Sequence, residues 1–292
     1  MREELDAFTS NVAAASLRGD YSRAAPDFTV EQDWNAYTDA EHALWRRLHR
    51  RQIELVPGRA CAAWLASLGA LDAGDAIPRF DAVSRRLARA TGWELVAVPG
   101  LIPDLAFFGH LASRRFPVTV WLRAPDEFDY IVEPDVFHDF FGHEPLLFDP
   151  AYADYMQAYG AGGLKAARLG ALGHLARLYW YTVEFGLLRE AGALRVYGAG
   201  ILSSGGEIRH ALESPLPRRI GFDLERLLRT EYRIDRFQDS YFVIDGFERL
   251  VADTAPDFAP IYERVRGLRS FAPDEAAPGD VVVPAMRPAL AS

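Results

Sequence analysis

The chain has 292 residues, of which 50% are hydrophobic and 25% are charged, a composition typical of a globular protein with a sizeable core. Its formal net charge of −9 argues against binding to nucleic acid or to anionic membranes, because those partners select for clustered Lys and Arg. With Cys61 as the single cysteine, an intramolecular disulfide and a cysteine-based metal cluster are excluded.

Residues 1–35 show no regular periodicity, and we expect them to form an extended N-terminal arm. The first residues lack the apolar segment of a secretory signal. No later stretch approaches the roughly 20 apolar residues that a membrane span needs. We therefore expect a cytoplasmic protein without a membrane segment.

Three helices are predicted next. The first begins at Thr38, which forms a capping box with Glu41 in which each side chain reaches the backbone N–H of the other residue. The other two, over 57–71 and 78–92, begin near a proline, and the second ends in a glycine that favours helix termination.

Short strands and helices alternate in the middle of the chain. The β-branched and alternating residues 93–100 and 116–123 predict two strands, with a helix over 103–115 between them. A further helix is predicted over 134–142. Residues 163–190 have continuous helical periodicity and are apolar nearly all round near their end, which indicates one long buried helix.

The C-terminal part predicts strand-like segments over 194–204 and 240–245 and helices over 221–234 and 257–270. The Pro/Ala-rich end, residues 270–292, predicts a loose tail. Because there is no internal repeat, we expect a single domain over residues 1–292 that is mainly α with a few short strands (α+β).

Two histidines, His138 and His143, lie five residues apart in the apolar segment VFHDFFGHEPLL. On an ideal helix this spacing turns their side chains roughly 140° apart, so they face one ion only where the helix ends or distorts. Pro145 disfavours a helical Glu144, so we expect the helix to end there and His143 to turn back toward His138. The pair is either a chelate or two unrelated histidines.

Glu184 lies in another apolar segment, ARLYWYTVEFGLL. A carboxylate there is costly to bury unless it is paired or binds a metal, so the alternatives are an ion pair with Arg177 or Arg189, or exposure to solvent. Two imidazoles and one carboxylate form the facial triad of non-haem Fe(II) enzymes, which leaves positions open for O2 and water. A structural zinc site would instead close at four protein ligands.

The segments EPDVFHDFFGHEPLL, ARLYWYTVEFGLL and YGAGILSSGGE closely resemble signature segments of the pterin-dependent aromatic amino acid hydroxylases. The resemblance covers about residues 30–265 and is closest to the bacterial members that act on phenylalanine. It implies the catalytic domain of that family and phenylalanine 4-monooxygenase activity. Such an enzyme converts L-phenylalanine to L-tyrosine with O2, tetrahydrobiopterin or a related tetrahydropterin, and non-haem Fe(II), through a ferryl intermediate.

The resemblance also implies roles for individual residues. The iron ligands would be His138, His143 and Glu184. The residues implied to hold the pterin, through backbone contacts and a stacked ring, are Gly100, Leu101, Ile102 and Phe107. The residues implied to lie around the iron and the pterin are Tyr179, Glu133 and Asp139.

On the substrate side, the resemblance implies that Arg123 holds the carboxylate, because a fork of donors suits that task. Trp180 and Phe185 would line the aromatic pocket, and Ser203 would support the site near the substrate and His138. Taken alone, Trp180 and Phe185 are also consistent with plain core, Phe107 is more consistent with a core aromatic than with a pterin contact, and Arg123 is consistent with a surface salt bridge.

Two positions depart from the family pattern: Ile131 replaces a residue that is often a hydroxyl in animal members, and Glu144 occupies a position that is usually apolar. Val243 is a candidate for a loop that reads the substrate ring. We expect neither the regulatory domain nor the tetramerisation helix of animal relatives, and therefore a monomer without substrate-driven activation.

Three rival functions remain open. A tryptophan or tyrosine hydroxylase would use the same triad. A zinc hydrolase would use the same ligands with Asp139 or Glu144 as a base, and a silent binding protein would keep only the scaffold.

Overall fold

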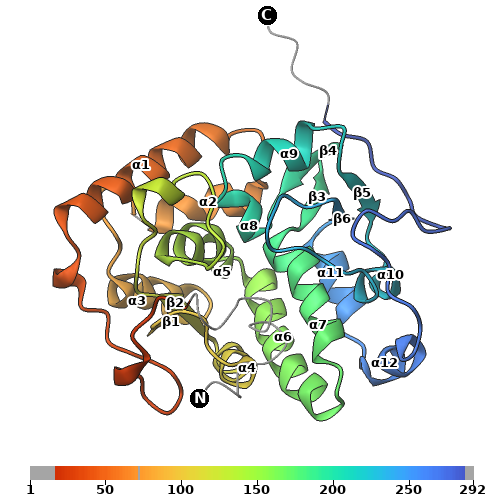
Figure 1. Cartoon of the computed structure of the whole chain (residues 1–292), viewed down its shortest axis with the longest axis horizontal. Helices are drawn as coiled ribbons and strands as arrows, with labels where there is room; N and C mark the ends of the chain where they lie inside the picture. The colour runs from red at the N-terminus through yellow and green to blue at the C-terminus, as the bar shows by residue number, and fades with distance from the viewer. Residues whose placement is uncertain (1–16, 72, 287–292) are drawn as a thin grey trace, which may run out of the picture.

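The computed structural model describes residues 17–71 and 73–286, in which helices surround two small sheets (Figure 1). The α-helices are α1 (Asp39–Leu55), α2 (Ala62–Leu71), α3 (Phe80–Ala90), α4 (Asp104–Ala112), α5 (Glu144–Leu147), α6 (Pro150–Arg168), α7 (Leu172–Tyr179), α8 (Ala199–Leu202), α9 (Glu207–Glu213), α10 (Leu224–Leu228), α11 (Phe247–Thr254) and α12 (Ala259–Val265). The 3₁₀ turns are η1 (Tyr21–Arg23), η2 (Trp34–Ala36) and η3 (Pro125–Glu127), and the π-helical segments are η4 (His138–His143) and η5 (Trp180–Glu184).

The strands form two separate sheets. β1 (Glu94–Val98) and β2 (Arg115–Thr119) pair in parallel, as the helix predicted between them requires. The second sheet has the order β4–β3–β6–β5, in which only the β3–β4 pair is antiparallel; its strands are β3 (Leu187–Glu190), β4 (Ala193–Val196), β5 (Arg218–Gly221) and β6 (Ser240–Ile244). In Figure 1 the first sheet lies beside α3 and the second beside α10, across the molecule. The predicted class, mainly α with a few short strands, is confirmed.

Helix α1 forms as predicted and supports the first histidine segment. Thr38 and Glu41 form both bonds of the capping box. The buried ring of Trp45 packs edge-on against Phe137 and Phe140, with ring centroids 5.2 and 5.9 Å apart. The apolar residues beside His138 therefore belong to the core and hold the η4 segment against α1.

The prediction of a single long helix over 163–190 is wrong. Helix α6 begins earlier and ends at Arg168, Gly170 then takes a left-handed φ of +63°, and α7 continues into η5 before β3 begins. Gly186 closes the turn into β3, where an added Cβ would lie 2.2 Å from the Tyr197 ring. All these elements bury one side in the same core, so the apolar periodicity persists across the breaks.

Other C-terminal elements also differ from the prediction. Residues 194–204 divide into the end of β4 and the short helix α8, and the helix predicted over 221–234 is reduced to α10. Helices α9 and α11 and strand β5 were not predicted. These elements are short, and helices of fewer than about 12 residues are marginal on their own, so packing with neighbours decides their conformation.

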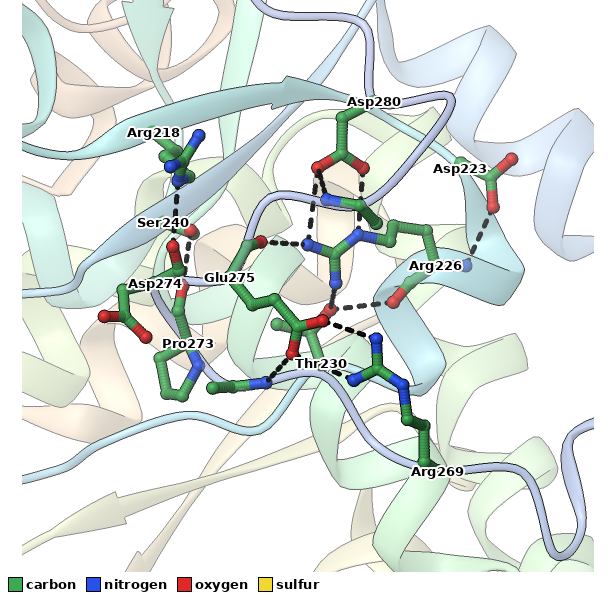
Figure 2. Close-up of polar contacts among 12 residues, drawn as sticks. Arg218, Asp223, Arg226, Thr230, Ser240, Arg269, Pro273, Asp274, Glu275 and Asp280 are labelled. Atoms are coloured by element: carbon green, nitrogen blue, oxygen red, sulfur yellow. Dashed lines mark hydrogen bonds and ion pairs between the residues drawn. The ribbon is translucent and has the colours of Figure 1, made fainter.

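The tail from residue 270 onward is docked, not loose, as far as residue 286. The N–H of Val283 donates to the Arg219 carbonyl, and the Val281 carbonyl accepts from the Gly221 N–H, both at 2.8 Å, so the segment pairs along β5. Figure 2 shows the ionic contacts that hold it, which we call the C-terminal clamp, formed by Arg226, Arg269, Glu275 and Asp280. Residues 287–292 lie outside the described part.

The described part of the N-terminal arm, residues 17–35, lies against the β1 end of the molecule. The Tyr21 hydroxyl donates to the Leu101 carbonyl at 2.8 Å, and the Val30 N–H donates to the Ala97 carbonyl at 2.9 Å. Residues 1–16 of the expected arm lie outside the described residues. Among residues 17–71 and 73–286, no helix combines the length and apolarity required to cross a bilayer.

Candidate active site

One cavity of about 230 Å³ brings together almost every site residue predicted from the sequence. Its wall includes all three candidate ligands, the candidate pterin residues and the candidate substrate residues. Of the predicted set, only Glu133 lies behind the wall, next to its lining neighbours Val132 and Pro134. Val243 is buried in the strand β6 and does not line this cavity, so its expected place in a loop is wrong, and its role in reading the ring stays a prediction.

The candidate ligands converge on one point. Nε2 of His143 lies 3.1 Å from one Glu184 oxygen, and Nε2 of His138 lies 3.4 Å from the other. The two Nε2 atoms are 3.3 Å apart, and the three ligand atoms lie within 4.8 Å of one another. The unrelated-histidine alternative and the Arg177 or Arg189 pairings of Glu184 do not hold in this arrangement.

The histidines converge by a different route from the one predicted. The helical backbone does not end at Glu144, which has helical dihedral angles (φ −66°, ψ −34°) and is the first residue of α5. Instead, residues 138–143 form a π turn, whose i→i+5 hydrogen bonds place residues five apart one above the other. Glu184 ends a second π turn, η5, so both ligand segments share this widened backbone.

Ser203 orients the His138 ring. Nδ1 of His138 lies 3.0 Å from the Ser203 hydroxyl, which itself donates to the Ala199 carbonyl at 2.9 Å. A hydroxyl that donates elsewhere accepts here, so the proton of the neutral ring is on Nδ1 and the Nε2 lone pair faces Glu184 and His143. Such outer partners commonly fix metal-ligating histidines, and the predicted supporting role of Ser203 agrees with this geometry.

Arg123 forms a buried ion pair, not the surface salt bridge considered above. Its Nε and Nη2 each donate to a different oxygen of Asp135 at 2.8 Å, and the pair is almost wholly buried. Asp135 also accepts the backbone N–H of His138 at 2.9 Å. The carboxylate therefore links the guanidinium at the cavity wall to the start of the ligand turn.

Asp139 and Glu144 are both buried acids next to the ligands, but they lie in different surroundings. Burial raises the pKa of Asp139, against the opposing effect of the two imidazoles and of the Thr119 N–H, which donates to it at 2.8 Å. Burial raises the pKa of Glu144 well above its usual value, and the nearby Asp139 adds to the shift. Neither Glu144 oxygen has a hydrogen-bond partner among the described residues, and Glu144 does not line the cavity.

On the side of the cavity expected to hold the pterin, Gly100 lets two side chains come close to the backbone. An added Cβ there would lie 2.9 Å from the Tyr21 hydroxyl and 3.0 Å from Oε1 of Glu133. That oxygen is buried and has no partner among the described residues, and burial raises the pKa of Glu133. The half-buried Phe107 ring lies edge-on to Tyr179, with centroids 5.7 Å apart, so it borders both the cavity and the core.

The opposite wall is aromatic. Trp180 stacks on Tyr232 with ring centroids 4.3 Å apart and lies 4.7 Å from Phe185. Both Trp180 and Phe185 are half-buried and line the cavity, so neither is plain core. Ile131 also lines the cavity and places an apolar side chain where a hydroxyl had been considered.

Several contributing residues were missed at the sequence level. Four residues either line the cavity or form hydrogen bonds with a residue that does: Asp135, Thr119, Glu207 and Gln238. Asp135 had a signal, because an Asp three residues before His138 is typical of a helix cap. The other three had none, since their partners come from distant elements.

The arrangement has the chemistry of an open metal site. Two neutral imidazoles and one carboxylate on one side of a point match the donor set of non-haem iron, and the rest of the cavity is mostly apolar. An enclosed apolar wall limits side reactions of a strong oxidant. One cavity with such a wall can hold a metal, a planar cofactor and an aromatic substrate together.

Comparison with known proteins places this geometry in context. A family profile described as biopterin-dependent aromatic amino acid hydroxylase matches residues 16–265. A phenylalanine-4-hydroxylase of Ralstonia nicotianae is 58% identical over 259 residues, which are 88% of this chain and 83% of that protein. The corresponding protein of Chromobacterium violaceum is 54% identical over 263 residues, 90% of this chain and 89% of its own.

Solved structures agree. The iron- and phenylalanine-bound crystal structure of phenylalanine hydroxylase from Chromobacterium violaceum superposes with a TM-score of 0.86 at 51% identity, covering 95% of this chain and 100% of that one. A cobalt-bound structure of the same enzyme gives a TM-score of 0.87 at 52% identity, covering 95% and 99%.

Proposed function

Because the chain belongs to the family of biopterin-dependent aromatic amino acid hydroxylases, we propose that it is a phenylalanine 4-monooxygenase that converts L-phenylalanine to L-tyrosine. Its co-reactants are O2, a tetrahydropterin such as tetrahydrobiopterin, and Fe(II). The observation that carries the proposal is the convergence of His138, His143 and Glu184 in the wall of one largely apolar cavity.

The donor set fits iron. His138 and His143 present Nε2 atoms, and Glu184 presents a carboxylate whose pKa the two imidazoles lower although burial opposes ionisation. When bound, iron and the reduced pterin together supply the electrons and the activated oxygen that hydroxylation requires. The residues themselves hold the site on one side and leave the cavity side open.

The pterin lies, in this proposal, along the segment after β1. The backbone groups of Gly100, Leu101 and Ile102 would hold it, and the Phe107 ring would stack on it. Two observations support this placement: the close approach of Tyr21 and Glu133 to Gly100, and the buried Glu133 oxygen without a partner among the described residues. Asp139 in the wall and Glu133 behind it would provide acceptors, and Tyr179 packs on the His143 ring.

The substrate occupies the opposite side. Arg123 holds the amino acid carboxylate, and Asp135 keeps the guanidinium plane fixed by its two bonds to Nε and Nη2. Trp180 and Phe185 wall the ring, so the side chain of phenylalanine lies toward the ligands. Ile131 adds an apolar side chain to the cavity wall, so the polar contact to the substrate that a hydroxyl would make there is missing.

Product analysis tests the proposal. The purified chain is incubated aerobically with Fe(II), a tetrahydropterin and each aromatic amino acid in turn, with one component omitted in each control. Tyrosine formed from phenylalanine only when all three components are present is the expected result. Hydroxylation of tryptophan or tyrosine in preference would reassign the substrate, and activity with zinc and no pterin would favour the hydrolase.

A monomeric state and a cytoplasmic location remain predictions of the sequence. Sedimentation or size-exclusion measurements on the full chain test the first of them, and a stable tetramer would contradict it.

A further inference from the structure

Gln238 lies where two segments of the cavity wall meet. It comes just before β6, and only 3% of its surface is exposed. It lines the cavity together with Trp180 of η5 and with Ile234 and Arg236 of the loop that precedes it. A residue in this place can control how the two segments stand relative to each other.

The side-chain amide of Gln238 joins these segments directly. Its Oε1 accepts from the indole Nε1 of Trp180 at 2.8 Å. Its Nε2 donates to the carbonyls of Arg233 and Arg236 at 2.9 and 3.3 Å. Because an indole N–H only donates and a backbone carbonyl only accepts, these partners determine the orientation of the amide.

The backbone of Gln238 is anchored independently. Its N–H donates to Oε1 of Glu207 at 3.0 Å, and its carbonyl pairs with Nε2 of His210 at 3.1 Å. Glu207 is buried on α9 and also accepts the hydroxyl of Tyr241 in β6. The position of the amide is therefore set by contacts with α9 and β6, independently of Trp180.

Trp180 connects this anchor to the reaction centre. Its ring is held between Tyr232 and Phe185, at centroid distances of 4.3 and 4.7 Å. It is also the first residue of η5, the π turn that ends in Glu184. A shift of the indole side chain would therefore alter the aromatic wall beside the turn that carries a ligand.

We propose that Gln238 is a positioning residue, which holds the Trp180 indole as a fixed wall of the aromatic pocket and so sets how the substrate ring is presented. The inference rests on the proposed function and deepens it. Leucine at this position has a similar size but leaves the indole N–H and two loop carbonyls without their partner, and unmet buried polar groups favour rearrangement.

The test compares Gln238→Leu, Trp180→Phe and the double variant in the full chain. Each single change is expected to raise the KM for phenylalanine about 5–10-fold, the effect of one lost hydrogen bond. It is also expected to lower the amount of tyrosine formed per tetrahydropterin oxidised, whereas iron content and the KM for the pterin stay unchanged. The KM and product ratio of the double variant should be no more impaired than those of the more impaired single variant, because both changes break the same hydrogen bond.

Gln52→Leu is the matched control, since Gln52 is also fully buried and its amide donates to the Leu202 carbonyl, away from Trp180. It should lower stability without changing the KM or the product ratio. If Gln238→Leu behaves like this control, or if the two single effects multiply in the double variant, the inference is overturned.

Two further outcomes separate the possible failures. If Gln238→Leu does not fold, Trp180→Phe decides alone, because it removes the indole donor and keeps Gln238; an unchanged KM and product ratio then refute the inference. Failure of the unmodified chain to form tyrosine contradicts the proposed function itself, whereas tyrosine formation with unshifted variants contradicts only the role of Gln238.

Discussion

The active-site cavity and the C-terminal clamp both bury charged side chains, but they differ in the partners that these side chains face. In the clamp, Arg226 donates to Asp280 at 2.9 Å, to the Thr230 hydroxyl at 2.7 Å and to the Glu275 carbonyl at 2.7 Å (Figure 2). Its guanidinium also lies over the Phe271 ring. In the cavity, acceptor atoms of two histidines and a glutamate face one another. Matched charges indicate a structural contact, whereas converging acceptors indicate a place for a cation.

The same contrast holds within the cavity. Arg123 is paired with Asp135 as completely as Arg226 is with Asp280 in the clamp, yet Arg123 also lines the cavity. Their pairing gives the guanidinium a fixed plane, which is what recognition of a carboxylate needs. A matched pair can therefore serve binding when one partner also faces a cavity.

The largest effect is expected from Glu184→Ala, which removes one of the three converging acceptors. Iron content and tyrosine formation should both be lost, beyond the roughly 10–100-fold effect typical of an outer-shell change. Metal analysis of the purified variant and product assay measure this. Glu225→Ala, which removes a half-exposed acid on α10, is the control and should retain iron; full activity of Glu184→Ala would contradict the metal site.

Arg226→Ala tests the clamp. Removing one partner of a buried pair leaves Asp280 uncompensated, so the free energy of unfolding should fall by about 3–5 kcal/mol, with the KM values of the folded enzyme unchanged. Urea unfolding measures the loss. Arg85→Ala breaks the exposed Arg85–Asp81 pair and should change stability by less than about 1 kcal/mol; equal losses would show that the clamp is no stronger than a surface contact.

Arg123→Lys tests the paired residue in the wall, because lysine keeps the charge beside Asp135 but loses the fork. The KM for phenylalanine should rise roughly 10–100-fold, as expected for loss of hydrogen bonds to a charged group. The KM for the pterin, measured in the same assays, serves as the internal control. An equal rise in both would contradict the assignment of Arg123 to the substrate carboxylate.

Ser203→Ala should have the smallest effect, about a tenfold loss of iron affinity, because it frees the His138 ring without removing a ligand. Competition with a chelator measures the affinity. Ser204→Ala is the neighbouring control: its hydroxyl accepts the Glu207 N–H and does not touch His138, so only stability should change. Unchanged affinity in Ser203→Ala would mean that the ring is held by packing alone.

The sequence by itself determined the chemistry of the centre and the class of the fold. Two histidines and one glutamate in apolar segments limited the site to a few possibilities, and the signature segments pointed to the family. The capping box of α1 and the strands β1 and β2 were also predictable, because local hydrogen bonds and side-chain alternation decide them.

Only the tertiary structure decided how the ligands meet and what surrounds them. The π turns at His138–His143 and Trp180–Glu184, the break at Gly170 and the docked tail all depend on contacts between distant segments. The Arg123–Asp135 pair and the amide of Gln238 have the same origin. Apolar periodicity records which side of an element is buried, but it carries no information on the partner that buries it, so these features are absent from the local pattern.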